Sequence, residues 1–367
     1  MIHEDFFCPN PCCKMHNNPG EGKWYYRNGK YFTKVRGNVQ IYVCNVCGKC
    51  FSDQTFSLDY YVKREVDYER IQNGIISGSG VRHISNELKI STDTVQNRIA
   101  RLARNLSAVN DSLLQNHQIT ENLAADGFES FSLSQYFPHH QNILVGEVSQ
   151  FLYVNDCVVL RRNGRMTDSQ KEHRKDLETI WKANPKGKEA SFLQLLRFAE
   201  NHIPKGQYRT LYTDEDRAYP RALKKIENKC LVQIQVSSKA PRNTKNLLFP
   251  CNYMDRLIRK DLANHKRETV QWAKTIHDMM NRGVIHQSFH NYRKQYRINA
   301  RKEERTTHAQ VAGIDKKCIQ RAFSQILKKR VFFSKVKLSM QSLRTWFRDW
   351  ENPLDYANKY VPKYAFM

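Results

Sequence analysis

Two pairs of cysteines near the start of the chain have the spacing of a metal site. Cys8 and Cys13 stand on either side of a Pro-Asn-Pro turn. Cys44 and Cys47 are separated by two residues, and Gly48 follows them. Two close pairs on tight turns form a tetrahedral thiolate site, and Zn²⁺ bound there supplies folding energy that so small a module lacks in its own core. We therefore predict a structural zinc ribbon over residues 1–60.

The other nearby cysteines leave two choices open. Cys12 could replace Cys13 as the partner of Cys8, although the longer step to Cys13 leaves more room for the turn. Cys50 is a spare thiol or an alternative ligand. Six of the ten cysteines lie within the first 50 residues, and the acidic start of the chain lacks the features of a secretion signal. In a cytosolic chain such a cluster indicates metal ligation before disulfide formation.

Two aspartates in the second half of the chain lie within or at the end of apolar segments. Asp126 lies in the segment 122–129 and Asp214 ends the segment 208–214. Cleaving or transferring a phosphodiester requires a deprotonated nucleophile and neutralisation of phosphate charge. Two Mg²⁺ or Mn²⁺ ions do both, and they need carboxylates held on adjacent rigid strands. A charge in an apolar strand is costly unless it is paired or metal-bound, so we predict that both aspartates bind metal. Asp216 is an alternative to Asp214 but lies further into the loop.

The segments around these acids predict a mixed five-stranded sheet. Three strands are expected at 122–129, 142–148 and 151–160, and a helical region at 177–198 follows. A strand at 208–214, a helix at 218–226, a strand at 231–236 and a long helix complete the series. This order is that of the ribonuclease H-like fold, which we predict for a catalytic domain over residues 120–300. Residues 301–367 are predicted to form a basic helical tail.

A helix-turn-helix domain is predicted over residues 61–110. An apolar stripe ends at Gly78-Ser79-Gly80, a short helix follows over 81–88, and Ser91 or Thr92 can cap a third helix. We expect that third helix to present side chains that reach base edges or phosphates in a major groove. These predicted DNA-binding residues are Thr94, Gln96, Asn97, Arg98, Arg101 and Arg104. A plain helical hairpin with a solvated basic face is the alternative.

The charge of the chain favours nucleic acid as the partner. Sixty Lys and Arg residues against 36 Asp and Glu give a formal net charge of +24 over 367 residues. Cationic side chains neutralise phosphates and release counterions. An anionic membrane surface is the competing partner, but the chain has no apolar run long enough to cross a bilayer. We expect a cytoplasmic protein associated with the nucleoid and no membrane contact.

The acidic segments and their surroundings resemble DDE-type insertion-sequence transposases of bacteria. Ala125-Asp126-Gly127 and the segment Thr213 to Pro220 are similar to the first two acidic motifs of that family. The segments 252–259 and 266–274 look like its third motif, and 306–314 is similar to a segment near the end of such enzymes. The likeness covers roughly residues 8–315, and the zinc ribbon and the order of the parts are its most specific features.

The third acid is where this chain departs from the family pattern. If the family spacing is counted from Arg259, the position of the third acid falls on Asn252, which is not an acid. If the position is located by the Asn-x-x-acid pattern, it falls on Asp255. An apolar stripe through Ile258 and Ile276 predicts one long helix, with Asp255 at the edge of the stripe and Glu268 several turns further on. We take Asp255 as the third catalytic acid and keep Glu268, or Asn252 as a neutral ligand, as alternatives. Basic residues beside it are expected to contact phosphates; those singled out are Arg256, Arg259 and Lys260.

The resemblance implies a transposase that binds double-stranded DNA at the terminal repeats of its element. Metal-activated water would free a 3′ end, and that hydroxyl would attack target DNA, with a homo-oligomer holding both ends together. A DNA-binding regulator derived from a transposase, whose acids no longer hold metal, is the first alternative. A metal-dependent nuclease that cuts without rejoining is the second.

Overall fold

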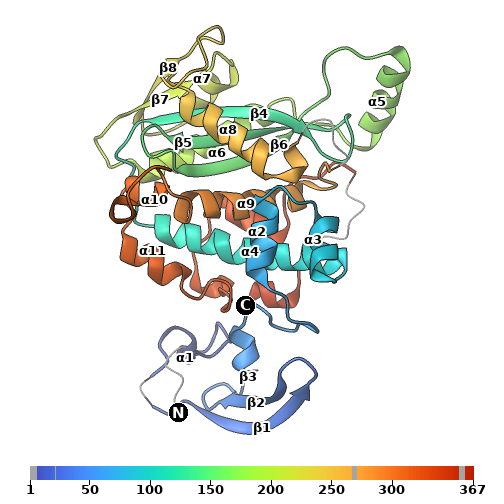
Figure 1. The fold of residues 1–367 in the computed structure, drawn as a ribbon, viewed down its shortest axis with the longest axis vertical. Coiled ribbons are helices and arrows are strands. Elements are labelled where there is room, and N and C mark those ends of the chain that lie inside the picture. Colours follow the sequence, from blue (N-terminus) through green and yellow to red (C-terminus); the bar gives the residue numbers. More distant parts are fainter. Residues whose placement is uncertain (1–5, 21, 267–270, 355–359) are drawn as a thin grey trace.

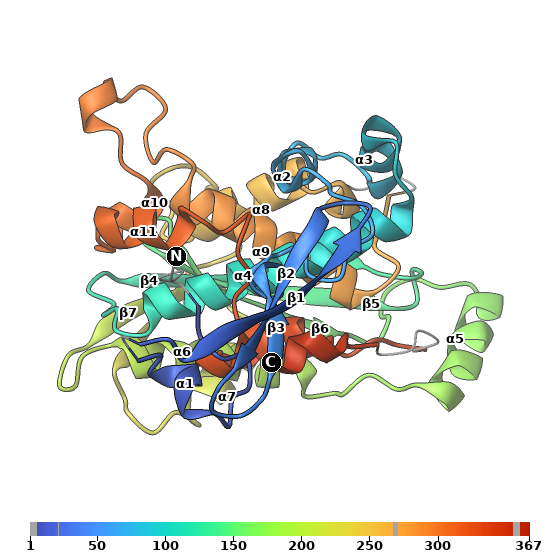
Figure 2. The ribbon, with the colours of Figure 1, turned by 90° about the horizontal axis from the view of Figure 1, so that it is seen from below.

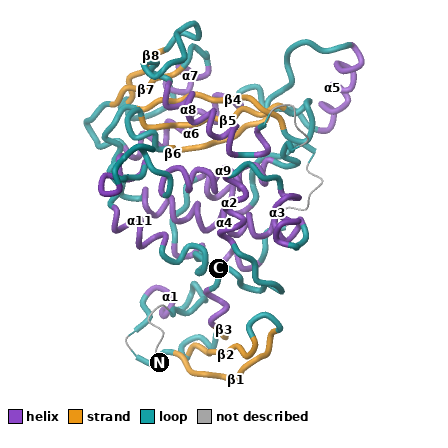
Figure 3. Tube along the Cα trace, viewed as in Figure 1, coloured by secondary structure: helices purple, strands orange, loops and turns teal. Residues whose placement is uncertain are grey.

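The molecule has three tiers along its longest axis. The computed structural model describes residues 6–20, 22–266, 271–354 and 360–367. A small cysteine-bearing module lies at one end, a layer of helices occupies the middle, and a larger sheet lies at the other end (Figure 1). Figure 3, which is coloured by secondary structure, shows the same tiers, with most of the helices between the two groups of strands.

The small module is an antiparallel three-stranded sheet preceded by one helical turn. The turn α1 spans Lys14–Asn17, and the strands β1 (Tyr25–Thr33), β2 (Gly37–Cys44) and β3 (Cys50–Ser52) follow in that spatial order. A register shift between Arg27 and Lys30 interrupts the β1–β2 pairing. The hairpin of β1 and β2 therefore connects the first cysteine pair to the second.

The middle tier is built around one long helix. The helices α2 (Tyr68–Ile76) and α3 (Val81–Leu88) precede α4 (Thr92–Leu114), and α9 (Ile276–Tyr292) packs along α4. Side-chain caps define two of these starts, because Asp67 accepts from the amides of Glu69 and Arg70, and Ser91 accepts from the amide of Thr94. Lys89 ends α3 in the left-handed conformation, with φ of 52°.

The large sheet is mixed, with strand order β6-β5-β4-β7-β8. The strands β4 (Leu123–Phe131), β5 (Pro138–Gly146) and β6 (Leu152–Val159) are antiparallel neighbours. The strands β7 (Arg209–Thr213) and β8 (Leu231–Gln235) continue parallel to β4. The prediction of a mixed five-stranded sheet is confirmed.

Helices cover both faces of this sheet, and alternate residues of β4 point to each face. Ala124 and Phe128 join a core that includes α8 (Phe249–Asp261), whereas Leu123 and Ala125 join a core that includes α6 (Gly187–His202). The short helix α7 (Ala218–Leu223) packs against α6. The helix α5 (Asp168–Ile180) has no buried residue and projects to one side (Figures 1 and 2).

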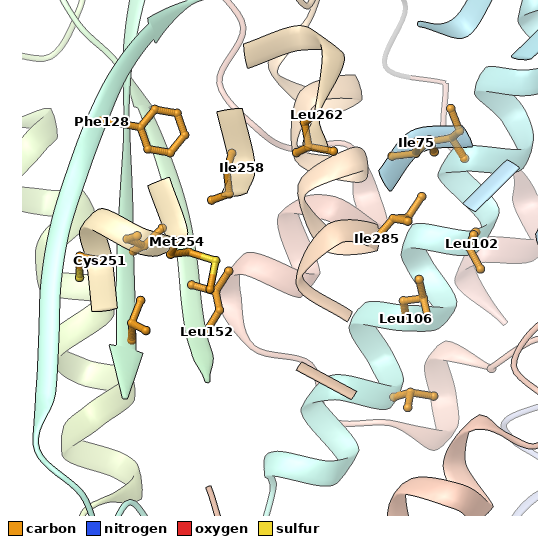
Figure 4. Packing of buried hydrophobic residues seen from close by; sticks show 14 of the residues in the cluster. Ile75, Leu102, Leu106, Phe128, Leu152, Cys251, Met254, Ile258, Leu262 and Ile285 are labelled. Atoms are coloured by element: carbon orange, nitrogen blue, oxygen red, sulfur yellow. The ribbon is translucent and has the colours of Figure 1, made fainter. Parts of the chain in front are cut away.

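One hydrophobic core joins the helical tier to the sheet. It runs from Phe128 on β4 through Met254 and Ile258 on α8 to Ile285 on α9, and then to Leu102 on α4 (Figure 4). The ranges predicted as separate domains, 61–110 and 120–300, therefore share their apolar packing.

The C-terminal segment packs against the rest of the chain instead of trailing from it. It forms α10 (His308–Val311), α11 (Lys316–Phe323) and α12 (Met340–Phe347), and both Trp346 and Trp350 are buried. The side-chain amide of Asn105 on α4 donates to the backbone carbonyls of Ile326 and Lys329. Residues 301–367 are thus partly core-forming, which their basic composition did not indicate.

The prediction of one long helix from 252 to 276 is wrong. The helix α8 ends at Asp261, and Leu262 takes an extended conformation with φ of −106° and ψ of 117°. The chain turns inward there because His265 is buried against the Phe128 ring. A new helix, α9, begins at Ile276, where Thr275 caps it by accepting from the amide of Asp278.

Candidate metal centre and carboxylate site

The four predicted cysteines meet at one point. The sulfur atoms of Cys8, Cys13, Cys44 and Cys47 all lie within 4.8 Å of one another. The Cys8–Cys47 pair is separated by 3.5 Å and the Cys13–Cys44 pair by 3.8 Å. A tetrahedron of thiolates at the usual zinc–sulfur distance has edges of about 3.8 Å. The donor set and its spacing fit a structural Zn²⁺, and Cys13 instead of Cys12 belongs to the group.

Two backbone turns hold these thiols in place. Gly48 has φ of +69° and its amide donates to the carbonyl of Cys44, which closes the turn after the second pair. The amide of Cys13 donates to the carbonyl of Asn10, which closes the first turn. Burial raises the pKa of the Cys8 thiol. A bound cation would offset that preference for the neutral form.

An aromatic cluster packs against three of the four cysteines. Phe6 stacks on Phe56 with ring centroids 4.9 Å apart, and Trp24 stacks on Phe51 at 5.7 Å. Phe332 from the C-terminal segment joins this cluster. The side chain of His16 is buried and bonds the carbonyl of Cys8 at 2.7 Å. His16 and Phe332 were not identified from the sequence, because neither belongs to a cysteine motif.

Asp126 and Asp214 lie near one another at the large sheet, because the charge of Asp214 acts on Asp126. On the adjacent parallel strands β4 and β7, Ala124 pairs with Tyr212. Two residues beyond this pair stand Asp126, which is on β4 and points to the same face as Ala124, and Asp214, which directly follows the last residue of β7. Ala124 and Tyr212 both belong to the core that α8 covers. Asp126 thus lies on the α8 face of the sheet, and Asp214 lies at the carboxyl end of β7.

The first turns of α8 approach the same place. Cys251 is buried on α8, and burial together with the charges of Asp126 and Asp255 raises its pKa well above the usual value. Asp255 follows Cys251 by one helical turn, so both side chains lie on one side of the helix. The structure therefore directs Asp255 toward the face that carries Asp126, whereas the partly exposed Asn252 is one residue past Cys251.

The surroundings of the two strand acids disfavour their ionised forms. Burial, aided by the charge of Asp214, raises the pKa of Asp126 to about 6, although the Gly127 amide donates to its carboxylate at 2.7 Å. Burial also raises the pKa of Asp214, and the charge of Asp216 acts in the same direction. A cation bound near two such carboxylates would stabilise their ionised forms and lower their pKa values.

Lys188 and His140 border the acids and were not identified from the sequence. Lys188 on α6 contacts Asp216 at 2.9 Å and Glu129 at 4.0 Å. A Cβ added to Gly127 would collide with the His140 imidazole, so this position on β4 needs glycine. Only folding brings Lys188 to the acids, since it lies 62 residues beyond Asp126 in the sequence.

The three predicted acids do not form a ready-made ligand cluster. Within the ranges that the structure describes, the four cysteines are the single group of three or more metal-binding side chains close enough to share an ion. Mg²⁺ is commonly held by one or two carboxylates together with water and substrate phosphates. A magnesium site therefore need not be complete before the substrate binds. Asp255 also lies 3.9 Å from Arg259. Glu268, the alternative third acid, lies outside the described residues.

Three of the residues expected to face DNA on α4 are buried instead. Arg98, Arg101 and Arg104 have exposed fractions of 5%, 7% and 5%. Arg101 donates to the carbonyls of Leu58 and Tyr60, and Arg104 donates to the carbonyl of Trp346. The expectation that they are exposed is wrong, because the segments before and after the helical tier close over this side of α4.

The remaining predicted DNA contacts stay at least partly accessible. Asn97 is exposed, and Thr94 and Gln96 are half-buried near the start of α4. On α8, Arg256 and Lys260 are exposed, whereas Arg259 is half-buried and lies over the Phe128 ring at 4.8 Å.

Comparison with known proteins adds no family assignment. The chain matches no protein-family model and no curated protein. Among the helices that the structure describes, none has the length and apolar character needed to cross a membrane.

Proposed function

We propose that this chain is a DNA transposase that cleaves and transfers strands at the ends of an insertion sequence with the help of divalent metal. The observation that supports the proposal is that Asp126 on β4 feels the charge of Asp214, which follows the parallel strand β7, and that both Asp126 and Asp255 act on Cys251 of α8. Acids on adjacent strands are what a metal-dependent phosphodiester reaction requires. The strand order β6-β5-β4-β7-β8 agrees with a ribonuclease H-like domain, and we propose that fold for it.

The proposed chemistry assigns a role to each group around the acids. Asp126 and Asp214 would hold Mg²⁺ or Mn²⁺, and Asp255 would complete the set. Such ions neutralise phosphate charge and activate water. Arg242 and Lys188 place positive charge near Asp126, where a DNA phosphate would approach. By resemblance to the transposase family, a freed 3′ hydroxyl then attacks the target strand.

The rest of the molecule supports DNA binding. The net charge of +24 favours a polyanionic partner. We propose that α3 and the start of α4 act as a helix-turn-helix, with Thr94, Gln96 and Asn97 toward DNA, and that the cysteine site holds Zn²⁺. A homo-oligomer acting on both ends, in association with the nucleoid, is part of the same proposal.

The test is a cleavage and joining assay on DNA that carries the element's ends, with Mg²⁺ or Mn²⁺. Asp126→Asn, Asp214→Asn and Asp255→Asn should each abolish cleavage while DNA affinity stays near that of the wild type. Glu215→Gln is the matched control, because Glu215 is exposed beside Asp214. Normal cutting by the Asp126 and Asp214 variants would overturn the proposed active site.

A DNA-binding regulator without catalysis is the second candidate. The observation that favours it is the lack of a three-acid ligand cluster among the described residues. Wild-type protein that binds element ends but never nicks them with Mg²⁺ or Mn²⁺ would identify the regulator. Cleaved products without joined products would instead identify a nuclease.

A further inference from the structure

The zinc module carries a strongly cationic strand and turn. Between residues 22 and 52 the chain has six Lys or Arg residues and no Asp or Glu, although Glu21 and Asp53 flank this range and Arg36 pairs with Glu65 at 3.7 Å. Strand β1 is exposed along most of its length, with its two end residues half-buried. This module lies at the opposite end of the molecule from the large sheet (Figure 1). Its charge therefore belongs to a surface separate from the carboxylate site.

A groove of about 630 Å³ opens on the outer face of the module's sheet. Its lining comes from all three strands of the module, from residues 33–35 and 54–55, and from the segment 60–63. Tyr31, Tyr60 and Tyr61 are among the lining residues, as are Lys34 and Lys63. None of the described residues that line the groove is acidic.

The register explains why aromatic rings gather on this face. Tyr26 pairs with Val43 and Tyr31 pairs with Val39, so both tyrosines lie on the face opposite the buried Tyr42. The exposed fractions of Tyr26 and Tyr31 are 51% and 37%. Rings of this size left open on a sheet beside cations are suited to stacking with a flat partner.

Tyr61 extends this surface from the segment 60–63. Its φ of 58° is unusual for a residue with a side chain, and its exposed fraction is 77%. Its ring centroid lies 4.1 Å from that of Tyr60. The backbone thus holds an aromatic ring at the mouth of the groove, where it gains little from burial.

Ring stacking together with unopposed positive charge is the chemistry that binds unpaired bases and their phosphates. Base pairs in a duplex expose only their edges in the grooves, so a stacking wall offers them little. An acidic protein would satisfy the lysines but would leave the exposed rings of Tyr31 and Tyr61 without a partner stacked on their open faces.

We propose that this groove binds single-stranded nucleic acid, with an unpaired base stacked on Tyr31 and Tyr61 and the adjacent phosphates near Lys34 and Lys63. The inference shares with the proposed function a nucleic-acid partner, but it does not require cleavage. The groove would hold a strand that has separated from its complement.

The test measures fluorescence anisotropy of zinc-loaded full-length protein without Mg²⁺ or Mn²⁺. The probes are a labelled thymidine oligonucleotide of ~12 nucleotides and a hairpin duplex of similar length, a size that spans a typical stacking site. Tyr31→Ala and Tyr61→Ala should each weaken single-strand binding by about 5- to 100-fold and change hairpin binding by less than about twofold. Tyr61→Phe should bind the single strand like the wild type.

Matched controls separate stacking from general effects. Tyr208→Ala removes another tyrosine, 65% exposed, outside the zinc module and should change nothing. Lys63→Gln should lower the salt dependence of binding without removing it. An Asp126→Asn, Asp214→Asn double variant should bind the single strand normally, so failure of the catalytic proposal and failure of this one are distinguishable.

Three results would overturn the inference. In the first, Tyr31→Ala and Tyr61→Ala bind the single strand as tightly as the wild type. In the second, they lose single-strand and hairpin binding equally, which would make the surface a phosphate patch. In the third, they alter only the oligomeric state, which would make it a protein contact.

Discussion

Asp126 shows how a candidate catalytic residue can lower the stability of the folded state. Its carboxylate lies on the covered face of β4 next to Asp214, and its pKa is raised to about 6 by burial and by that neighbour. An unfolded aspartate has a pKa of about 3.9. Because the pKa is higher in the folded state, protonated Asp126 stabilises the folded state fully below about pH 4. This stabilisation is lost as the pH rises through 6. At neutral pH the folded state therefore holds a charge that it disfavours.

We predict that Asp126→Asn stabilises the metal-free protein at pH 7.5 by roughly 1–3 kcal/mol in the free energy of unfolding. The gain should shrink at pH 5, where Asp126 is largely protonated in the wild type. Urea unfolding at the two pH values measures both quantities. Glu215→Gln, which changes an exposed acid, should have little effect, and a gain for Asp126→Asn that is equal at both pH values would contradict the explanation.

Helix α4 shows that the charge of a side chain does not decide where it lies. Arg101 reaches the carbonyls of Leu58 and Tyr60 across the junction between the zinc module and the helical tier. Its guanidinium also lies 4.6 Å from the centre of the Tyr364 ring. The arginine therefore joins three segments and is occupied by intramolecular bonds.

Arg101→Ala is expected to lower the free energy of unfolding by roughly 2–4 kcal/mol, because two buried carbonyls lose a charged donor. Thermal unfolding of the zinc-loaded protein measures this loss. Arg82→Ala, which changes an exposed residue on α3, should leave stability nearly unchanged. If Arg101→Ala lowers DNA affinity with no loss of stability, the burial of Arg101 does not describe its role.

We expect the cysteine-bearing module to depend on a metal held by its four thiolates as well as on its aromatic cluster. Removing zinc with a chelator should unfold residues 6–52 while the large sheet remains folded, because the two tiers have separate cores. Hydrogen exchange by mass spectrometry would locate the loss. Cys44→Ser should reproduce it, and Cys50→Ser, an exposed thiol outside the cluster, should keep the wild-type zinc content. Intact protection of β1 and β2 in the chelated protein would count against a structural metal.

At the scale of the whole molecule, the C-terminal segment holds the tiers together. Phe332 packs under the zinc module, Ile326 joins the core of the helical tier, and Arg344 on α12 forms a 3.0 Å ion pair with the buried Asp156 on β6. Each tier therefore gains a contact from residues beyond 320.

Deleting residues 301–367 should leave a protein that aggregates or unfolds at least 10 °C below the full chain, since large apolar surfaces on α4 and β6 lose their cover. Differential scanning calorimetry and gel filtration provide the readout. Asn105→Ala gives a milder test, because it removes only the bonds to Ile326, Lys329 and Val331. A truncated chain as stable as the full one would show that this segment is dispensable.

Features that depend on neighbouring residues were determined by the sequence itself. The cysteine pairs with Gly48, the Ser91 cap and the strands around Asp126 and Asp214 all follow from short-range spacing and apolar pattern. These features could be predicted because turn closure, capping and strand alternation act over a few residues. The choice of Cys13 over Cys12 followed from the same local geometry.

Only the tertiary structure decided what depends on segments far apart in the chain. The burial of Arg98, Arg101 and Arg104, the end of α8 at Asp261 and the approach of Lys188 to Asp216 involve partners tens to hundreds of residues away. Periodicity shows that a helix has an apolar stripe but not which segments will cover its polar side. The charged residues of α4 and the C-terminal segment are buried because folding supplies carbonyl, carboxylate and aromatic partners for them.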